Sequence, residues 1–342
     1  MLEFIKQQLA LHPAIMPQDV LKMCFQAAYG AEHLLTDIEK VKSYFVSEYE
    51  KTEPTNEPIM ELIAPEVCRV NIGSWKKANL PPEWLFDLFV QSASTHLPDG
   101  DKHFFEFINN WSKFAQDNGQ ALAFSFENFC DVINNYNEIC NGKPQAVHHS
   151  SHYKENEKPA YRVISGAYVR LIPVLEAVSA RGSTGVIAID GRAASGKSTL
   201  AEGLRSVIGA EIIHMDDFFL PPELRTEERL AQPGGNIHYE RFIQEVLPYL
   251  SDTTTPFEYR KFNCSIMDYD GVRNIKPSKW RVVEGTYSHH PKFGEYMSIP
   301  VFSDIDAATQ MERITARNGE KMAEMFATKW IPMEEKYFSS KN

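Results

Sequence analysis

The feature that most constrains this chain is a glycine-rich loop that directly follows a short apolar run. Residues 184–190 read TGVIAID, and such a run, rich in β-branched residues, predicts a strand buried on both faces of a parallel sheet. The next residues, GRAASGKST, contain the spacing GxxxxGKS and lead into the helical stretch STLAEGLRSV. In this order of strand, loop and helix, the backbone N–H groups and the helix N-terminus face a polyphosphate. The sequence therefore predicts a phosphate-binding loop formed by Gly191, Ala193, Ala194, Ser195, Gly196, Lys197, Ser198 and Thr199.

Charged side chains follow the loop at positions that suit phosphate chemistry. We expect Lys197 to reach the β- and γ-phosphates of a nucleotide and Ser198 to place its hydroxyl on Mg²⁺. Asp216 and Asp217 follow the apolar run AEIIHM, and Glu284 follows RVV, so all three carboxylates come at the ends of predicted strands, where open α/β sheets bind ligands. A carboxylate there accepts a proton from an attacking hydroxyl or helps to hold Mg²⁺.

Two arginines near the end of the chain complete the set of candidate residues. Arg313 and Arg317 are four residues apart in MERITARNGE and so share one face of a predicted helix. Guanidinium groups suit the transfer of a phosphoryl group. Their N–H groups donate hydrogen bonds to its oxygens, and their positive charge compensates the negative charge on those oxygens.

The second half of the chain alternates between predicted strands and helices. The strand candidates 184–190, 210–215, 281–285 and 298–302 are separated by helical stretches, which predicts an α/β domain with a mostly parallel sheet. The first half has helical signals instead, at 81–94, 101–116 and 125–142, and we interpret it as an all-helical domain. A polar, turn-prone segment at 142–159 separates the two, so the expected domains are 1–160 and 161–342.

Composition excludes several classes of protein. The chain has 342 residues and a formal charge of −11, and residues 1–180 are more acidic (15 basic, 23 acidic) than the rest (20 and 23). An acidic chain without a basic patch is not expected to bind nucleic acid. Five cysteines without a CxxC pair favour reduced thiols. No apolar run approaches about 18 residues, so we expect a cytoplasmic protein with no membrane partner.

These motifs together resemble the uridine kinase, phosphoribulokinase and pantothenate kinase group, most closely the bacterial proteins labelled uridine kinase-like. The resemblance covers residues 165–342 and rests on IAIDGRAASGKST, HMDDFFLP, VVEG and RITARN. It implies the three-layer fold of P-loop NTPases, with ATP and Mg²⁺ as cofactors. It also implies Asp216 as the catalytic base, Lys197, Ser198 and Glu284 in phosphate and metal roles, and Arg313 and Arg317 in a lid. Asp217 is a further candidate metal contact.

The acceptor is less defined than the phosphate donor. By their place in the resemblance, QPGGNIHYERF and FEYRKFNC suggest His238, Tyr259 and Arg260 as substrate contacts. The chain has Asp217 and Phe219 where uridine kinases usually have a small residue and a tyrosine, so we expect phosphoryl transfer to a hydroxyl of a small metabolite rather than to uridine in particular. The alternative is an NTP-hydrolysing or NTP-sensing switch whose helical domain binds a partner. A nucleotide-monophosphate kinase and a homo-oligomer stay open.

The first half also holds a candidate second site. Its segments AYGAEHLL, CRVN, AVHHSSHY and PAYRV contain polar residues that could converge, and His148, His149 and His152 lie close together in sequence. Adjacent histidines in a loop are more often surface or hydrogen-bonded residues than metal ligands.

Overall fold

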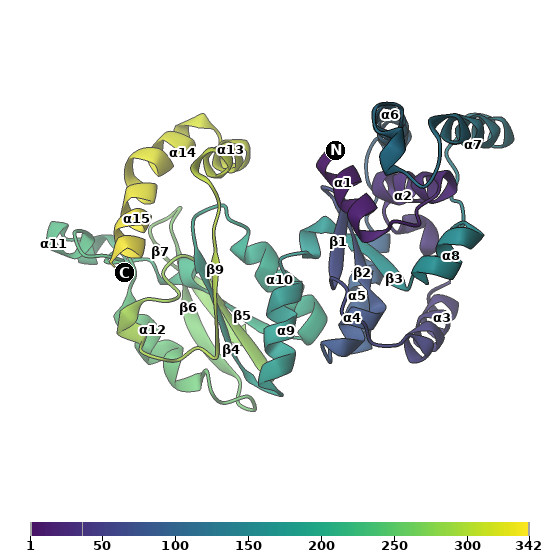
Figure 1. The fold of residues 1–342 in the computed structure, drawn as a ribbon. Helices are drawn as coiled ribbons and strands as arrows, with labels where there is room; N and C mark the ends of the chain where they lie inside the picture. Colours follow the sequence, from purple (N-terminus) through teal and green to yellow (C-terminus); the bar gives the residue numbers. More distant parts are fainter. Residues whose placement is uncertain (1, 36, 341–342) are drawn as a thin grey trace. The chain divides into compact units, whose positions relative to one another are not determined.

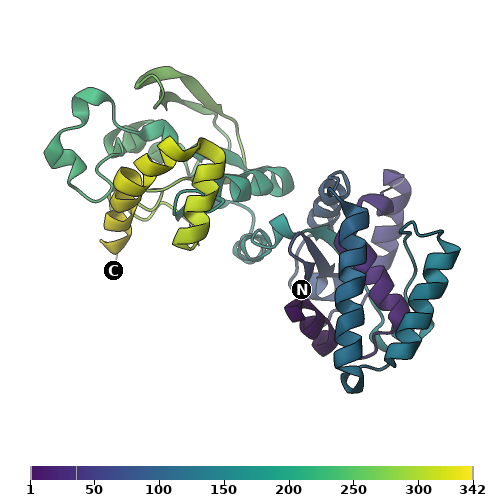
Figure 2. The ribbon, with the colours of Figure 1, turned by 90° about the horizontal axis from the view of Figure 1, so that it is seen from above.

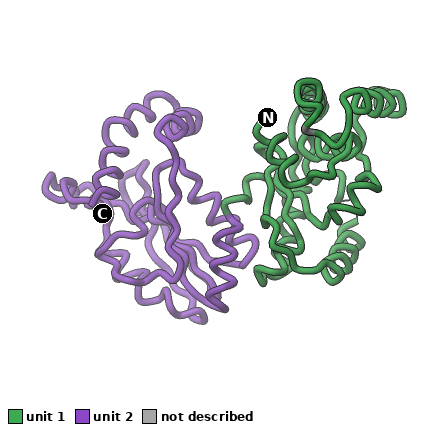
Figure 3. The backbone as a smooth tube through the Cα atoms, in the orientation of Figure 1, with its two compact units in different colours: residues 1–170 green, residues 171–342 purple. Residues whose placement is uncertain are grey.

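The chain divides into two compact units in the computed structural model, which describes residues 2–35 and 37–340. Unit 1 is residues 1–170 and unit 2 is residues 171–342 (Figure 3). The predicted boundary between residues 160 and 161 falls at the start of a strand that pairs within unit 1, and the division of the structure lies ten residues later. Within the described residues, no helix is long and apolar enough to cross a membrane.

Unit 1 is built around a three-stranded antiparallel sheet in the order β1-β2-β3. Its strands are β1 (Met60–Ala64), β2 (Val67–Asn71) and β3 (Tyr161–Ser165). Residues 67–70 of β2 are all buried, so both faces of the sheet are covered. The register opposes Arg69 of β2 to Glu61 on one side and to Val163 on the other.

Helices pack on both faces of this sheet (Figure 1). On one face, α2 (Pro17–Tyr29) contacts β1, α6 (Gly100–Asp117) and α7 (Phe126–Ile139), and α1 (Leu2–Leu11) contacts β1 and α6. On the other, α5 (Pro82–Ala93) contacts β3 and α3 (Ile38–Lys51). The short helices α4 (Ile72–Lys77) and α8 (Ser151–Glu157) complete the unit.

The prediction that the first half is entirely helical is wrong. The helices α5, α6 and α7 are confirmed, with the Ser125 hydroxyl accepting a hydrogen bond from the Asn128 N–H at the start of α7. The sequence does not reveal these strands because each has only five residues. In addition, β2 pairs not only with the adjacent β1 but also with β3, which lies far along the chain. Short polar segments such as CRVN carry no period from which a strand is recognised.

Unit 2 contains a four-stranded parallel sheet in the order β5-β8-β4-β9, which confirms the predicted α/β class with a parallel sheet. The strands are β4 (Gly185–Gly191), β5 (Glu211–His214), β8 (Trp280–Glu284) and β9 (Ile299–Ser303). β8 is buried along its whole length, as a central parallel strand should be. An antiparallel hairpin, β6 (Phe257–Asn263) and β7 (Asp268–Ile275), was not predicted.

The described part of unit 2 contains seven α-helices. They are α9 (Ile172–Arg181), α10 (Lys197–Ile208), α11 (Glu227–Leu230) and α12 (Tyr239–Glu245), followed by α13 (Ala307–Asn318), α14 (Glu320–Met325) and α15 (Ile331–Ser339). Pro173 lies in the first turn of α9, where its missing N–H costs nothing, so it begins the helix rather than interrupting it. In Figures 1 and 2 the yellow helices α13, α14 and α15 form an arch that extends from the end of β9.

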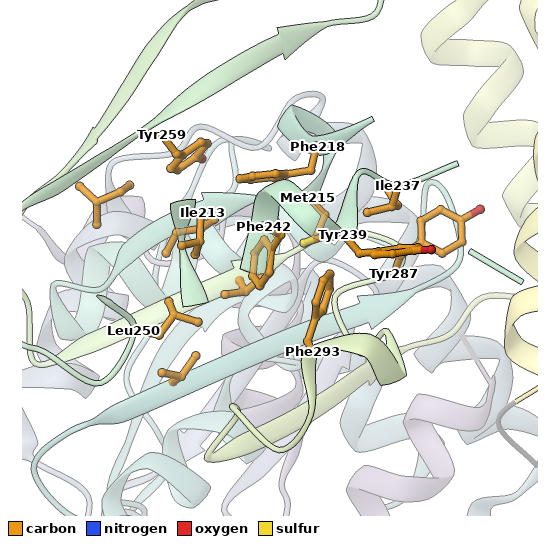
Figure 4. Close-up of a cluster of buried hydrophobic side chains, with 14 of the residues drawn as sticks. Ile213, Met215, Phe218, Ile237, Tyr239, Phe242, Leu250, Tyr259, Tyr287 and Phe293 are labelled. Atoms are coloured by element: carbon orange, nitrogen blue, oxygen red, sulfur yellow. The ribbon is translucent and has the colours of Figure 1, made fainter. Parts of the chain in front are cut away.

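An aromatic cluster anchors the segments around the ends of β5 and β8. Phe218, just after β5, packs edge-on against Phe242 of α12, with ring centroids 5.2 Å apart, and against Tyr259 of the hairpin (Figure 4). Phe293 packs on the other side of Phe242, at 4.3 Å. Burial of this much aromatic surface fixes the turn after β5 against the hairpin and α12.

Candidate active site

The predicted phosphate-binding loop connects β4 to α10, in the order of strand, loop and helix that the motif requires. Gly191 has φ +139°, and a Cβ there would lie 2.0 Å from the carbonyl oxygen of Ser303 in β9, so only glycine fits. Gly196 has φ +94° and caps the N-terminus of α10, and Ala194 also has a positive φ. The loop is therefore held in a tight curl next to a helix N-terminus, a geometry that suits anions.

Lys197 is folded back along this loop. The residue is 8% exposed, and its Nζ donates to the carbonyl oxygens of Gly191 and Arg192 at 2.9 and 2.7 Å. Burial lowers the pKa of Lys197, while the negative charges of Glu334, Asp216 and Glu284 oppose that shift. The ammonium group thus lies among carboxylates at the base of the loop.

Ser198, Glu284 and His214 form a hydrogen-bonded row beside the loop. The Ser198 hydroxyl donates to Glu284 Oε2 at 3.1 Å, and Glu284 Oε1 lies 2.6 Å from His214 Nδ1. Glu284 is buried at the end of β8, and His214 ends the neighbouring strand β5. Oxygen atoms of hydroxyl and carboxylate groups are the ligands that Mg²⁺ prefers. Ser198 and Glu284 therefore fit a magnesium ion that is bound together with phosphate oxygens.

A cavity of about 720 Å³ brings most of the predicted site residues together. Its walls include residues 193–199 of the loop, Asp216, Glu284, Arg313 and Arg317. The Arg313 guanidinium donates to the carbonyl oxygen of Ala194 at 3.3 Å, so α13 lies against the loop. Asp216 is exposed to the cavity, and desolvation together with the negative charge of Glu284 raises its pKa.

Glu334 of α15 is a wall residue that the sequence did not reveal. Its Oε2 accepts a hydrogen bond from the backbone N–H of Ala193 at 3.1 Å, so a carboxylate occupies part of the predicted phosphate-binding loop. Burial raises the pKa of Glu334 to about 7, although the Ala193 N–H and the charges of Lys197 and Arg192 favour its ionised form. Nothing in IPMEEKYF distinguishes this residue from a surface glutamate, because its contact depends on where the last helix lies.

Several predicted residues do not line the cavity. The Asp217 side chain, 5% exposed, lies 3.1 Å from both Arg273 Nε and the Tyr259 hydroxyl, so the carboxylate points to the hairpin rather than into the cavity. Tyr259 is buried in that contact. His238 caps α12, Arg260 pairs with Glu245 at 2.8 Å, and neither residue lines the cavity, so their substrate role stays a prediction.

Other residues occupy the part of the cavity beyond the loop. They include Phe219, Arg225, Asn236, Cys264, Ser265, Met267, Thr286, Tyr287 and Trp330. Asn236 is buried, and in the described part of the chain its Oδ1 has no hydrogen-bond partner. It lies within QPGGNIHYERF, so the expected segment does reach the cavity, through a different residue from His238. Among the described residues, no group of three or more His, Cys, Asp or Glu side chains is arranged to hold a metal ion.

Comparison with known proteins gives a likeness in structure alone. No protein-family model matches the chain, and no curated protein matches it. Among solved structures, the chain is similar to one described as a possible uridine kinase from Bacillus stearothermophilus, with 17% sequence identity and a TM-score of 0.33. The match covers 46% of this chain and 91% of that chain.

Proposed function

We propose that unit 2 is a P-loop NTPase domain that transfers a phosphoryl group from ATP, with Mg²⁺, to a hydroxyl of a small metabolite, as in uridine kinase-like enzymes. The observation that carries the proposal is the composition of one cavity. It combines a GxxxxGKS loop, the carboxylate of Asp216 and the arginines of α13. The loop alone indicates nucleotide binding. A carboxylate in the same cavity can also take up the proton of the substrate hydroxyl that attacks the phosphate.

On the donor side, each residue has a defined task. Residues 193–199 and the N-terminus of α10 bind the phosphates, and Lys197 exchanges its carbonyl partners for phosphate oxygens. Ser198 and Glu284 hold Mg²⁺, which neutralises charge on the phosphates when bound. Arg313 and Arg317 compensate charge on the transferring group.

On the acceptor side, Asp216 accepts the proton of the attacking hydroxyl as its oxygen bonds to the γ-phosphorus and ADP leaves. The raised pKa of Asp216 suits this task, since it makes the carboxylate a better base than an ordinary aspartate. The unpartnered Oδ1 of Asn236 accepts a hydrogen bond from a second polar group of the substrate. A polyhydroxylated acceptor meets both requirements.

The test is transfer of labelled phosphate from ATP across panels of nucleosides, sugars and vitamins. An acceptor-dependent rate is expected, and Asp216→Asn should lower it by about 10² to 10⁴ with little change in ATP affinity. Lys197→Ala should nearly abolish turnover while leaving the fold intact. Acceptor-independent hydrolysis of ATP that Asp216→Asn leaves unchanged would instead favour an NTP-hydrolysing switch.

A further inference from the structure

Helices at the end of the chain contact the backbone of the predicted phosphate-binding loop. Two contacts come from α13, where Gln310 Nε2 donates to the carbonyl oxygen of Ala193 at 3.2 Å and the Arg313 guanidinium donates to that of Ala194. A third comes from α15, where Glu334 Oε2 accepts a hydrogen bond from the Ala193 N–H. Phosphate oxygens bind to the N–H groups of such a loop and not to its carbonyl oxygens. Of these three contacts, only that of Glu334 engages a donor that a bound nucleotide needs.

The loop satisfies its own phosphate-binding donors with acceptors of the protein. Lys197 Nζ donates to two backbone carbonyl oxygens of the loop, and the Ala193 N–H donates to the carboxylate of Glu334. Glu334 is 6% exposed and lines the same cavity as residues 193–199, so its contact lies inside the site. A carboxylate oxygen matches a phosphate oxygen in charge and in the hydrogen bonds that it accepts. The two therefore compete for one N–H group.

Other contacts of α15 hold this helix in place. Tyr337, one turn after Glu334, donates from its hydroxyl to Asp190 Oδ2 at 2.7 Å, and Asp190 is buried in β4. Glu335 forms an ion pair with Arg192 of the loop. Because these contacts anchor α15, the side chain of Glu334 can leave the Ala193 N–H, or be removed by substitution, while the helix stays packed.

We propose that the carboxylate of Glu334 holds the place of a nucleotide phosphate oxygen at the Ala193 N–H and must leave when ATP binds, so that Glu334 sets the affinity of the loop for nucleotide. This inference rests on the proposed function in that the loop binds ATP. The arriving phosphate repels the carboxylate and takes over the hydrogen bond from Ala193. Binding therefore loses the free energy of the Glu334 contact, and the nucleotide is held less tightly than by the same loop without that contact.

Calorimetric titration of the full chain with Mg²⁺ and β,γ-methylene-ATP, which is not hydrolysed, tests this competition. Glu334→Ala removes the competitor and should bind the analogue about three- to tenfold more tightly than the unaltered chain, the factor that corresponds to one hydrogen bond. Glu334→Gln keeps an oxygen acceptor at the same place, so it should bind no more tightly than the unaltered chain. Glu324→Gln removes an exposed negative charge from α14 of the same arch, and this matched control should leave the affinity unchanged.

Exchange of the Ala193 amide proton with solvent, followed by NMR of the chain labelled with isotopic alanine, reports on the contact itself. Without nucleotide, exchange should be faster in Glu334→Ala than in the unaltered chain, because the hydrogen bond protects the amide proton. The analogue should slow the exchange in both chains, since a phosphate oxygen takes over the bond. Glu334→Ser, whose side chain is too short to reach the loop, should behave in the same way and takes the place of Glu334→Ala if that variant fails to fold.

The affinities separate failure of this inference from failure of the proposed function. Equal affinities of the unaltered chain and Glu334→Ala overturn the inference and leave the proposed function standing. An equal gain in Glu334→Ala and in either glutamine variant also overturns it, because the loss of charge alone then explains the effect. If neither the unaltered chain nor any variant binds the analogue, the nucleotide site is wrong, and the proposed function and the inference are both overturned.

Discussion

Replacing Glu334 with glutamine should stabilise unit 2, and the gain should depend on pH. The Glu334 carboxyl has a pKa of about 7 in the folded chain, against 4.5 for an ordinary glutamate. Below pH 4.5 the group is neutral in both the folded and the unfolded state, so its charge has no effect on stability. Between pH 4.5 and 7 the unfolded state loses the proton while the folded state keeps it, so stability falls as pH rises.

The size of the effect follows from the same two values. Above pH 7 the ionised Glu334 destabilises the fold by about 3 kcal/mol, whereas at pH 5 the penalty is below ~1 kcal/mol. Glutamine keeps the shape and can still accept a hydrogen bond from the Ala193 N–H, but it carries no charge. Glu334→Gln should therefore raise the free energy of unfolding by ~3 kcal/mol at pH 8 and by much less at pH 5.

Urea unfolding of the 5-fluorotryptophan-labelled chain, followed by fluorine NMR, measures this for each unit separately. Trp280 and Trp330 report on unit 2, and Trp75, Trp84 and Trp111 report on unit 1, which should not respond. Glu335→Gln is the matched control, because it removes a partly exposed ion pair with Arg192 and should change stability by less than about 1 kcal/mol. An equal gain at pH 5 and pH 8, or a loss at pH 8, would refute the assignment of a buried, destabilising carboxylate.

Two further substitutions test the frame around the cavity. Gly191→Ala should lower the free energy of unfolding, measured in urea titrations, by more than about 3 kcal/mol, because the new methyl group meets the backbone of Ser303. Gly209→Ala is the control: Gly209 also has a positive φ, but the space around it is open, so the loss should be only about 1 kcal/mol. Equal losses would contradict the close approach of β4 and β9. Asp217→Asn breaks the ion pair with Arg273, so the free energy of hydrogen-exchange protection in residues 257–275 should fall by about 1 to 3 kcal/mol. Asp216→Asn is the control and should leave that protection unchanged. The reverse result would mean that the two carboxylates have exchanged places.

Local sequence determined the part of unit 2 whose geometry is set by neighbouring residues. The run 184–190, the glycines at 191 and 196 and the helix after them specify a strand, a tight curl and a helix N-terminus within one short segment, because each requires particular backbone angles. The parallel strands were recognisable because each is a short apolar run between helical stretches. Asp216 and Glu284 could be placed near the loop because adjacent parallel strands end at the same edge of a sheet.

Tertiary structure decided what depends on contacts between distant segments. Asp216 and Asp217 are adjacent in sequence, but the turn after β5 directs one to the cavity and the other to Arg273 of the hairpin. Glu334 reaches the loop only because α15 returns to it, about 140 residues after Ala193. In unit 1, the pairing of β2 with β3 and the packing of α2 bring Arg69, Tyr161 and Gln26 into one network. No local period encodes such contacts, because their free energy is gained only when the whole unit has folded.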